Sequence, residues 1–131
     1  MGAENLVIAA KDIPETSEVT SFSHAFYNCS SLSSVPGMSL WETSQVTSMG
    51  FMFNGASAFK GDIAGCDTSK VIDMSWMFNE ASVFNQDIGG WNVSNVTDME
   101  AMLSESALST ENYDAILTDC SKRGFFWRGK Y

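Results

Sequence analysis

The chain has 131 residues, of which 44% are hydrophobic, and a formal net charge of −9. This composition predicts one folded domain and fits a folded protein better than a disordered chain. No apolar run approaches the roughly 18 residues that a membrane-crossing helix requires, so we expect no membrane span. All sixteen acidic residues lie within residues 1–121 beside only three lysines, so we expect this part of the chain to repel nucleic acid.

The first predicted element is an N-terminal cap over residues 1–15, which contain the apolar stretch "NLVIAA". Stacked repeats expose apolar faces at their two ends, so we expect a strand here to cover the first repeat unit. No secretion signal is visible, because Glu4 takes the place of a basic region and no long apolar core follows it.

Residues 16–108 contain four units of similar sequence. Residues 59–74 and 84–99 are identical at eight of sixteen positions. The units are anchored on Val19, Val46, Val71 and Val96, at steps of 27, 25 and 25 residues. Two of the apolar columns that follow the anchors hold Met49, Met52, Met74, Met77, Met99 and Met102, which we expect in the core. A catalytic motif needs to appear once, whereas a unit that cannot bury its own apolar face recurs, so the repeat predicts a stacked array.

Each unit is expected to contain one helix and one strand. Apolar residues at 0, 3, 6, 7 and 10 after the anchor share one helical face, which predicts a short helix near residues 47–54 in the second unit. The sequence "TDME" at 97–100 matches a capping box. The stretches "GDIAG" (61–65) and "QDIGG" (86–90) are too short for a second helix, and we interpret them as parallel strands.

The chain ends in a predicted cap helix over residues 109–121, which begins at Ser109 or Thr110 and no longer follows the repeat. Residues 122–131 form a basic aromatic tail. Such a tail would suit a membrane surface or single-stranded nucleic acid, but we favour one folded over an exposed end of the core. The predicted fold class is therefore α/β: one domain, a short leucine-rich-repeat-like solenoid of about four helix-plus-strand coils with a strand cap and a helix cap.

Catalytic chemistry finds little support in the sequence. His24 is the only histidine, so a multi-histidine metal site is excluded, and no phosphate-binding glycine-rich loop is present. Asp62 and Asp87 occupy equivalent positions, but a repeat gives both carboxyls the same surroundings, unlike the acid and the nucleophile of a glycosidase. Calcium binding between them stays open, with a solvated edge as the default. We expect no catalytic residue, no metal site and no cofactor.

The cysteines show no paired spacing. Cys29 and Cys66 each replace a residue of an apolar or small column, so both are interpreted as buried free thiols rather than as parts of a disulfide framework. The third cysteine, Cys120, falls in the cap helix.

Two surfaces are candidate binding sites. The first is the column five residues after the anchors, which points away from the apolar face of the predicted helix and holds His24, Phe51 and Trp76, then Ala101. Adjacent exposed aromatic rings suggest a contact patch, although neighbouring loops covering them is an equal alternative. The second is the strand face, which holds Lys60, Asp62, Asn85, Gln86 and Asp87.

Three stretches, "WNVSNVTDM", "FNQDIGGW" and "LSTENYDAIL", resemble the BspA-like leucine-rich-repeat family, which includes the 25-residue DUF285 repeats of bacterial and mycoplasma surface proteins. The resemblance covers about residues 16–120, and the first unit, with "CSSLSSVPGMSLWE", is closer to the longer variant of the family. It implies a protein of the cell surface, secreted or associated with a virion, with roles in adhesion or recognition and no shared enzymatic residues.

The expected function is thus a non-catalytic recognition or adhesion module of a cell-surface or phage-tail-type protein, binding a protein or a glycan on a rigid repeat surface. The alternative is a structural spacer or self-assembly module, in which the aromatic column and the basic tail join copies of the chain.

Overall fold

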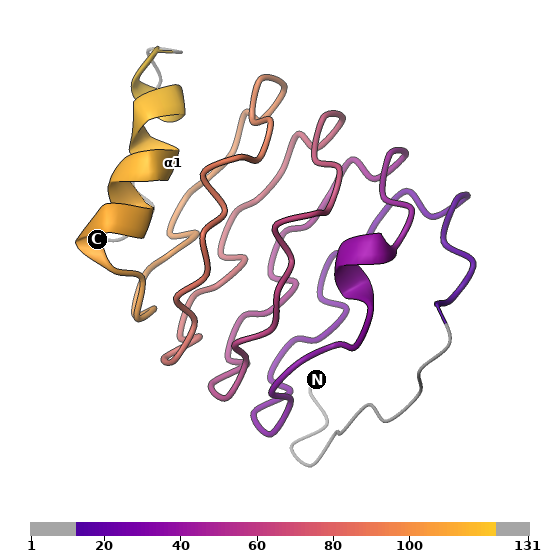
Figure 1. The fold of residues 1–131 in the computed structure, drawn as a ribbon, viewed down its shortest axis with the longest axis horizontal. Helices are drawn as coiled ribbons and strands as arrows, with labels where there is room; N and C mark the ends of the chain where they lie inside the picture. The colour runs from indigo at the N-terminus through magenta and orange to yellow at the C-terminus, as the bar shows by residue number, and fades with distance from the viewer. Residues whose placement is uncertain (1–12, 123–131) are drawn as a thin grey trace.

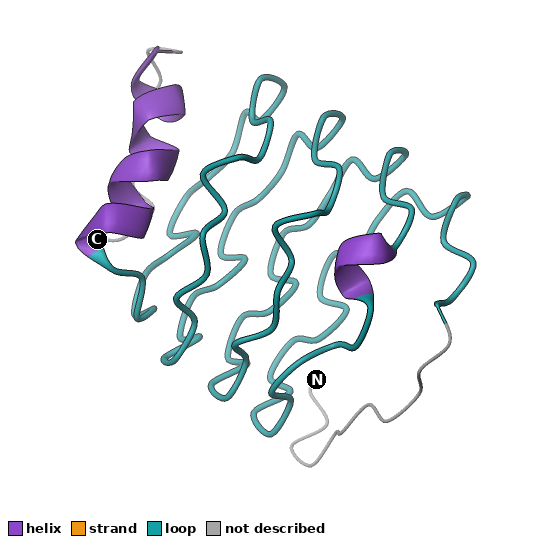
Figure 2. Ribbon diagram, viewed as in Figure 1, coloured by secondary structure: helices purple, strands orange, loops and turns teal. Residues whose placement is uncertain are grey.

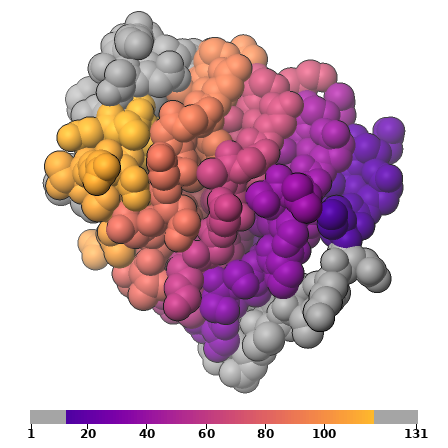
Figure 3. Space-filling model, in the orientation of Figure 1, coloured from indigo at the N-terminus to yellow at the C-terminus, as the bar shows by residue number. Residues whose placement is uncertain are grey.

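The structure, a computed structural model, describes residues 13–122, with side chains as far as Ile116. The chain winds into coils that lie side by side in sequence order, and a helix follows at the C-terminal end (Figure 1). On the surface the same order appears as neighbouring bands (Figure 3). Most of the predicted N-terminal cap and of the basic aromatic tail lies outside the described residues.

The described part of the chain contains very little regular secondary structure. Its two helices are the 3-10 helix η1 (Met38–Leu40) and the α-helix α1 (Thr110–Lys122). Apart from η1, the coils between residues 13 and 109 consist of turns and loops, with isolated bridges in place of strands (Figure 2). The predicted α/β class is therefore wrong, as is the predicted solenoid of helix-plus-strand coils. The strand that a leucine-rich repeat requires is absent from residues 13–122.

The predicted helix near residues 47–54 does not form because the backbone is bonded to the next coil instead. In a helix each N–H would donate to the carbonyl four residues earlier. Here alternate N–H groups of the second coil donate across to the third coil at 2.8 to 2.9 Å. The donors are Met49, Phe51, Phe53 and Gly55, and the acceptors are Asp73, Ser75, Met77 and Asn79. The N–H groups in between close turns within the coil, such as Met52 to Met49 at 3.2 Å.

The predicted strands at 61–65 and 86–90 are also turns. A carboxylate oxygen of Asp62 accepts the backbone N–H of Ala64 at 3.0 Å, and Asp87 accepts that of Gly89 at 2.9 Å. These short loops bend the backbone away from the extended path of a strand. Parallel pairing is confined to single bridges that join Ser21, Ser48, Asp73 and Asp98 in register.

The core lies inside the coils and is built from columns of equivalent side chains. Val46, Val71 and Val96 are fully buried, and the six methionines of the two predicted columns are buried as expected. Phenylalanine rings form a second column, in which Phe53 lies 5.7 Å from Phe78, and each of them stacks on a ring of its own coil at 4.0 Å. Burial of equivalent residues in successive coils makes one continuous core.

The C-terminal end of this core is covered by α1. The hydroxyl of Ser109 accepts the N–H of Asn112 at 3.2 Å, so Ser109, one of the two expected cap residues, caps the N-terminal end of α1. Ile116 is buried against the last coil. Neither described helix has the length and apolar character needed to cross a bilayer.

Candidate functional site

The structure brings three of the predicted site residues together in one row. The rings of His24 and Phe51 are stacked with centroids 4.7 Å apart and planes 7° apart. Phe51 and Trp76 follow at 6.0 Å and 9°. His24 is exposed, and Phe51 and Trp76 are half-buried. We call His24, Phe51 and Trp76 the aromatic row, because they form a continuous stack across three coils.

The backbone holds each member of the aromatic row in the same unusual conformation. His24, Phe51 and Trp76 have φ angles of 60°, 58° and 56°, which non-glycine residues seldom adopt. Their N–H groups donate to the next coil at 3.1, 2.9 and 2.8 Å. The left-handed residue turns each ring out of the core column, so the predicted outward direction arises from a turn and not from a helix.

Parallel stacking decides which part of each ring is open to a ligand. Neighbouring rings lie nearly parallel at 4.7 and 6.0 Å, so each internal ring face has another ring of the row beside it, and the outer faces of His24 and Trp76 end the row. Tyr27, which is not among the predicted site residues, lies beside the row, 5.5 Å from His24 and 6.4 Å from Phe51. It occupies a column that is otherwise polar, with Asn54 and Asn79 at the equivalent positions, and therefore left no repeating signal.

The second predicted surface is engaged largely in internal contacts. Asp62 and Asp87 close their own turns, as described above. Gln86 Nε2 donates to the carbonyl of Lys60 at 3.0 Å, which joins two coils. Asn85 Oδ1 accepts hydrogen bonds from Ser109 N and Asn112 Nδ2 at 2.8 and 3.0 Å, which connects the last coils to α1. These groups lie in turns and not on a strand face, although all but the half-buried Gln86 are exposed.

Other acidic side chains also have a structural role at the corners of the coils. A hydrogen bond from the Ser69 hydroxyl, with a second from its backbone N–H, holds the pKa of Asp67 below its ordinary value. The equivalent hydrogen bonds from Ser44 lower the pKa of Glu42 in the preceding coil. Much of the negative charge of this protein therefore serves to fix turns.

Among the described residues, the two cysteines have buried thiols. Burial raises the pKa of the Cys66 thiol to about 11, with a smaller contribution from Asp62, so the thiol stays protonated at neutral pH. Cys29 and Cys66 are both buried and free, as predicted.

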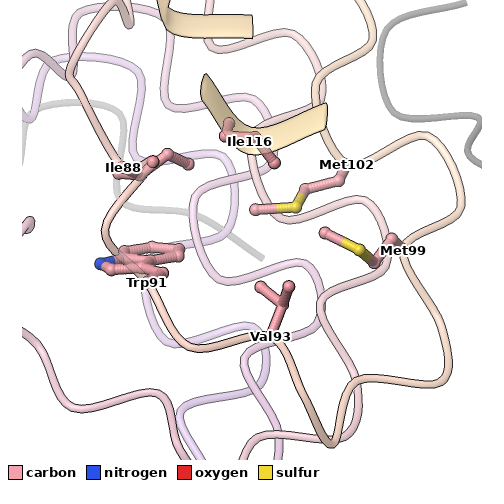
Figure 4. Close-up of a pocket in the computed structure, with 7 residues that line it drawn as sticks. Ile88, Trp91, Val93, Met99, Met102 and Ile116 are labelled. Carbon is pink, nitrogen blue, oxygen red and sulfur yellow. The ribbon is translucent and has the colours of Figure 1, made fainter. Parts of the chain in front are cut away.

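An apolar cavity of about 10 Å³ lies under α1 and has room for one water-sized group (Figure 4). No group of three or more metal-ligating side chains gathers within residues 13–116.

The fold and the row define a protein of stacked, irregular coils that displays aromatic rings on its surface. The chain belongs to the DUF285 family: the family model described as "Mycoplasma protein of unknown function, DUF285" matches residues 3–116. The predicted resemblance to DUF285-type repeats is thus confirmed. No curated protein and no solved structure shows significant similarity to the chain.

Proposed function

We propose that this chain is a non-catalytic recognition or adhesion module that binds a protein or a glycan through the aromatic row. The observation that carries the proposal is the stacking of His24, Phe51 and Trp76 on a partly exposed surface. Aromatic side chains supply a large share of binding energy in protein interfaces. A row of three is more than a core needs, since the coils already have buried phenylalanine columns of their own.

The rigidity of the row supports the same function. Each ring is fixed by its neighbour and by a backbone hydrogen bond to the next coil. Side chains that are ordered before binding lose little conformational entropy when a ligand arrives, so more of the contact energy remains as affinity. The coils thereby act as a frame for rings that come from distant parts of the sequence.

The resemblance to bacterial surface proteins supports a location on a cell surface, in a secreted protein or on a virion. Recognition of another molecule is a common task in such places. The proposal assigns no catalytic residue, because the chain has a single histidine, which in this structure is stacked in the row and shares a 2.8 Å hydrogen bond with Ser23.

The test compares binding of the wild-type chain and of variants of the row to a glycan array and to a displayed peptide library. Replacing Phe51 and Trp76 together by leucine keeps apolar bulk and removes the rings, and we expect ligand binding to fall by about tenfold or more. Leu40→Ser changes a side chain that is 69% exposed and outside the row, and serves as the control. Circular dichroism establishes that each variant is folded. Ligands that bind the double variant as tightly as the wild type would refute the role of the row.

A further inference from the structure

The aromatic row ends one coil before the last coil of the structure. Ala101 has a φ of 50° and occupies the position that His24, Phe51 and Trp76 hold in the earlier coils. The N–H of Trp76 donates to the carbonyl of Glu100 at 2.8 Å, which places Ala101 in the coil next to the indole. The methyl group of Ala101 is smaller than the rings at the equivalent positions, and we call the place beside Trp76 and Ala101 the open step. Among the described residues, the ring contacts of Trp76 are limited to Phe51, so its other face has no ring against it.

The backbone at this step also has two N–H groups without a hydrogen-bond partner among the described residues. In the preceding coil the N–H groups of Trp76 and Glu80 donate to the last coil at 2.8 and 2.9 Å. The equivalent N–H groups, those of Ala101 and Glu105, form no hydrogen bond with any residue between 13 and 122. Ala101 is half-buried and Glu105 is exposed. A peptide that lies along this edge would offer its carbonyl oxygens to them, as in the addition of a strand to a sheet edge.

The charge around the open step is negative. Residues 71–109 contain six carboxylates and no lysine, arginine or histidine. Three exposed members, Glu80, Glu100 and Glu105, belong to the two coils that border the step. Electrostatic complementarity therefore favours a cation over a neutral or anionic group.

We propose that the step beside Trp76 and Ala101 binds the guanidinium group of an arginine in a peptide segment of a partner protein. A guanidinium is planar, stacks on indole within about 6 Å, and donates hydrogen bonds to carboxylates at the same time. The spacing of the existing rings, 4.7 and 6.0 Å, matches that of such a stack. This inference rests on the proposed recognition function and names the group that the end of the row would bind.

The test follows the indole N–H signal of Trp76 by NMR in the full chain, with the signal assigned by comparison with Trp76→Phe. The probes are acetyl-Gly-Arg-Gly-amide and its lysine counterpart. We expect a saturable shift with the arginine peptide and binding about tenfold weaker with the lysine peptide, since an ammonium does not stack. Ala101→Phe should fill the step and abolish the shift, whereas Ala101→Gly should preserve it. Glu100→Gln with Glu105→Gln should weaken binding by about threefold or more.

Several results would overturn the inference. Equal binding of the arginine and lysine peptides would show that the site recognises positive charge and not the planar guanidinium. An undiminished shift of the Trp76 signal in folded Ala101→Phe would show that the arginine binds elsewhere. A shift that appears only after Arg123 and Arg128 are both changed to lysine would assign the step to the tail of the chain itself and not to a partner. Absence of arginine binding, with array or library ligands still dependent on Phe51, would remove this inference and leave the proposed function in place.

Discussion

The hydroxyl of Thr68 donates a 3.0 Å hydrogen bond to the carbonyl of Asn92 in the next coil. Thr43 and Thr16 make the same contact one and two coils earlier, at 3.0 and 2.8 Å. All three threonines are buried, and the last coil has Val93 at the equivalent position. The threonine column therefore joins coils through the interior, and it ends where α1 replaces the next coil.

Thr68→Val should lower the free energy of unfolding by about 1–2 kcal/mol, because the shape is kept while the hydrogen bond from the buried Thr68 side chain to the carbonyl of Asn92 is lost. Thr20→Val is the matched control, since the Thr20 side chain is exposed. Urea denaturation of both variants measures the difference. Equal stability of the two variants would mean that the buried hydroxyl contributes nothing.

The neighbouring glycines 89 and 90 should respond differently to the same substitution. A Cβ at Gly89 would lie 2.5 Å from the Cβ of Ala115 in α1, whereas a Cβ at Gly90 would meet nothing within 4 Å. Gly89→Ala should push α1 away from the last coil and cost about 1–3 kcal/mol. Gly90→Ala should be neutral or stabilising by up to about 1 kcal/mol. Thermal unfolding of the pair measures this, and a harmless Gly89→Ala would contradict the close packing of α1.

Glu80 offers a stabilising substitution. Its φ is 60°, a conformation in which Gly55 serves at the equivalent position of the preceding coil. Glu80→Gly should raise the free energy of unfolding by about 1 kcal/mol, because glycine adopts a positive φ without the Cβ clash. Glu100→Gly, at an exposed glutamate without a positive φ, should instead destabilise the protein. Chemical denaturation of the two variants gives the comparison, and destabilisation in both would show that the left-handed turn costs nothing at residue 80.

Acid should weaken the corners of the coils. The pKa values of Glu42 and Asp67 are lowered in the folded chain by hydrogen bonds from serine, so the unfolded chain takes up protons first as the pH falls. The stabilisation is complete above the ordinary values of 4.5 and 3.8, and it is lost as the pH falls through the lower values of the folded state. Melting temperatures measured from pH 7 to pH 3 should therefore decrease at the acid end.

Asp67→Asn provides the control for this pH dependence. Asn92 already performs the same task one coil later, where its Oδ1 accepts the N–H of Ser94 at 2.9 Å. The variant should fold normally at pH 7 and lose less stability than the wild type between pH 5 and pH 3. An unchanged acid profile would show that Asp67 does not contribute to it.

The sequence predicted which residues share a place in each coil better than it predicted the backbone between them. The burial of the valine and methionine columns and the outward column of His24, Phe51 and Trp76 follow from spacing alone. Spacing of 3, 4 and 7 residues is typical of a helix, but turns interrupted by a left-handed residue produce it as well. The bonds that decide between them run to residues about 25 positions away, which local patterns do not reveal.

Two further features of the fold, the threonine column and the turns at the corners of the coils, have a recurring pattern in the sequence. Threonine recurs three residues before the anchors at 16, 43 and 68 and then gives way to Val93, which marks the last coil. Acidic residues followed two positions later by serine, as in Asp67 and Ser69, mark the corners. Such pairs favour turns over strands because the side chain bonds the backbone locally.

The alternating hydrogen bonds between coils have a consequence for how the molecule changes in length. Equivalent hydrogen bonds recur from coil to coil, some donated to the following coil, as by Met49, and some to the preceding one, as by Thr47 and Ile72. Deletion or duplication of residues 46–70 as a block would therefore leave each donor with an equivalent acceptor. Insertion of a single residue would instead misalign the pairs that span it, which join the interrupted coil to its neighbours. The number of displayed rings can thus grow or shrink only in whole steps, and a chain of this kind can adjust the span of its surface by genetic duplication without redesigning its interior.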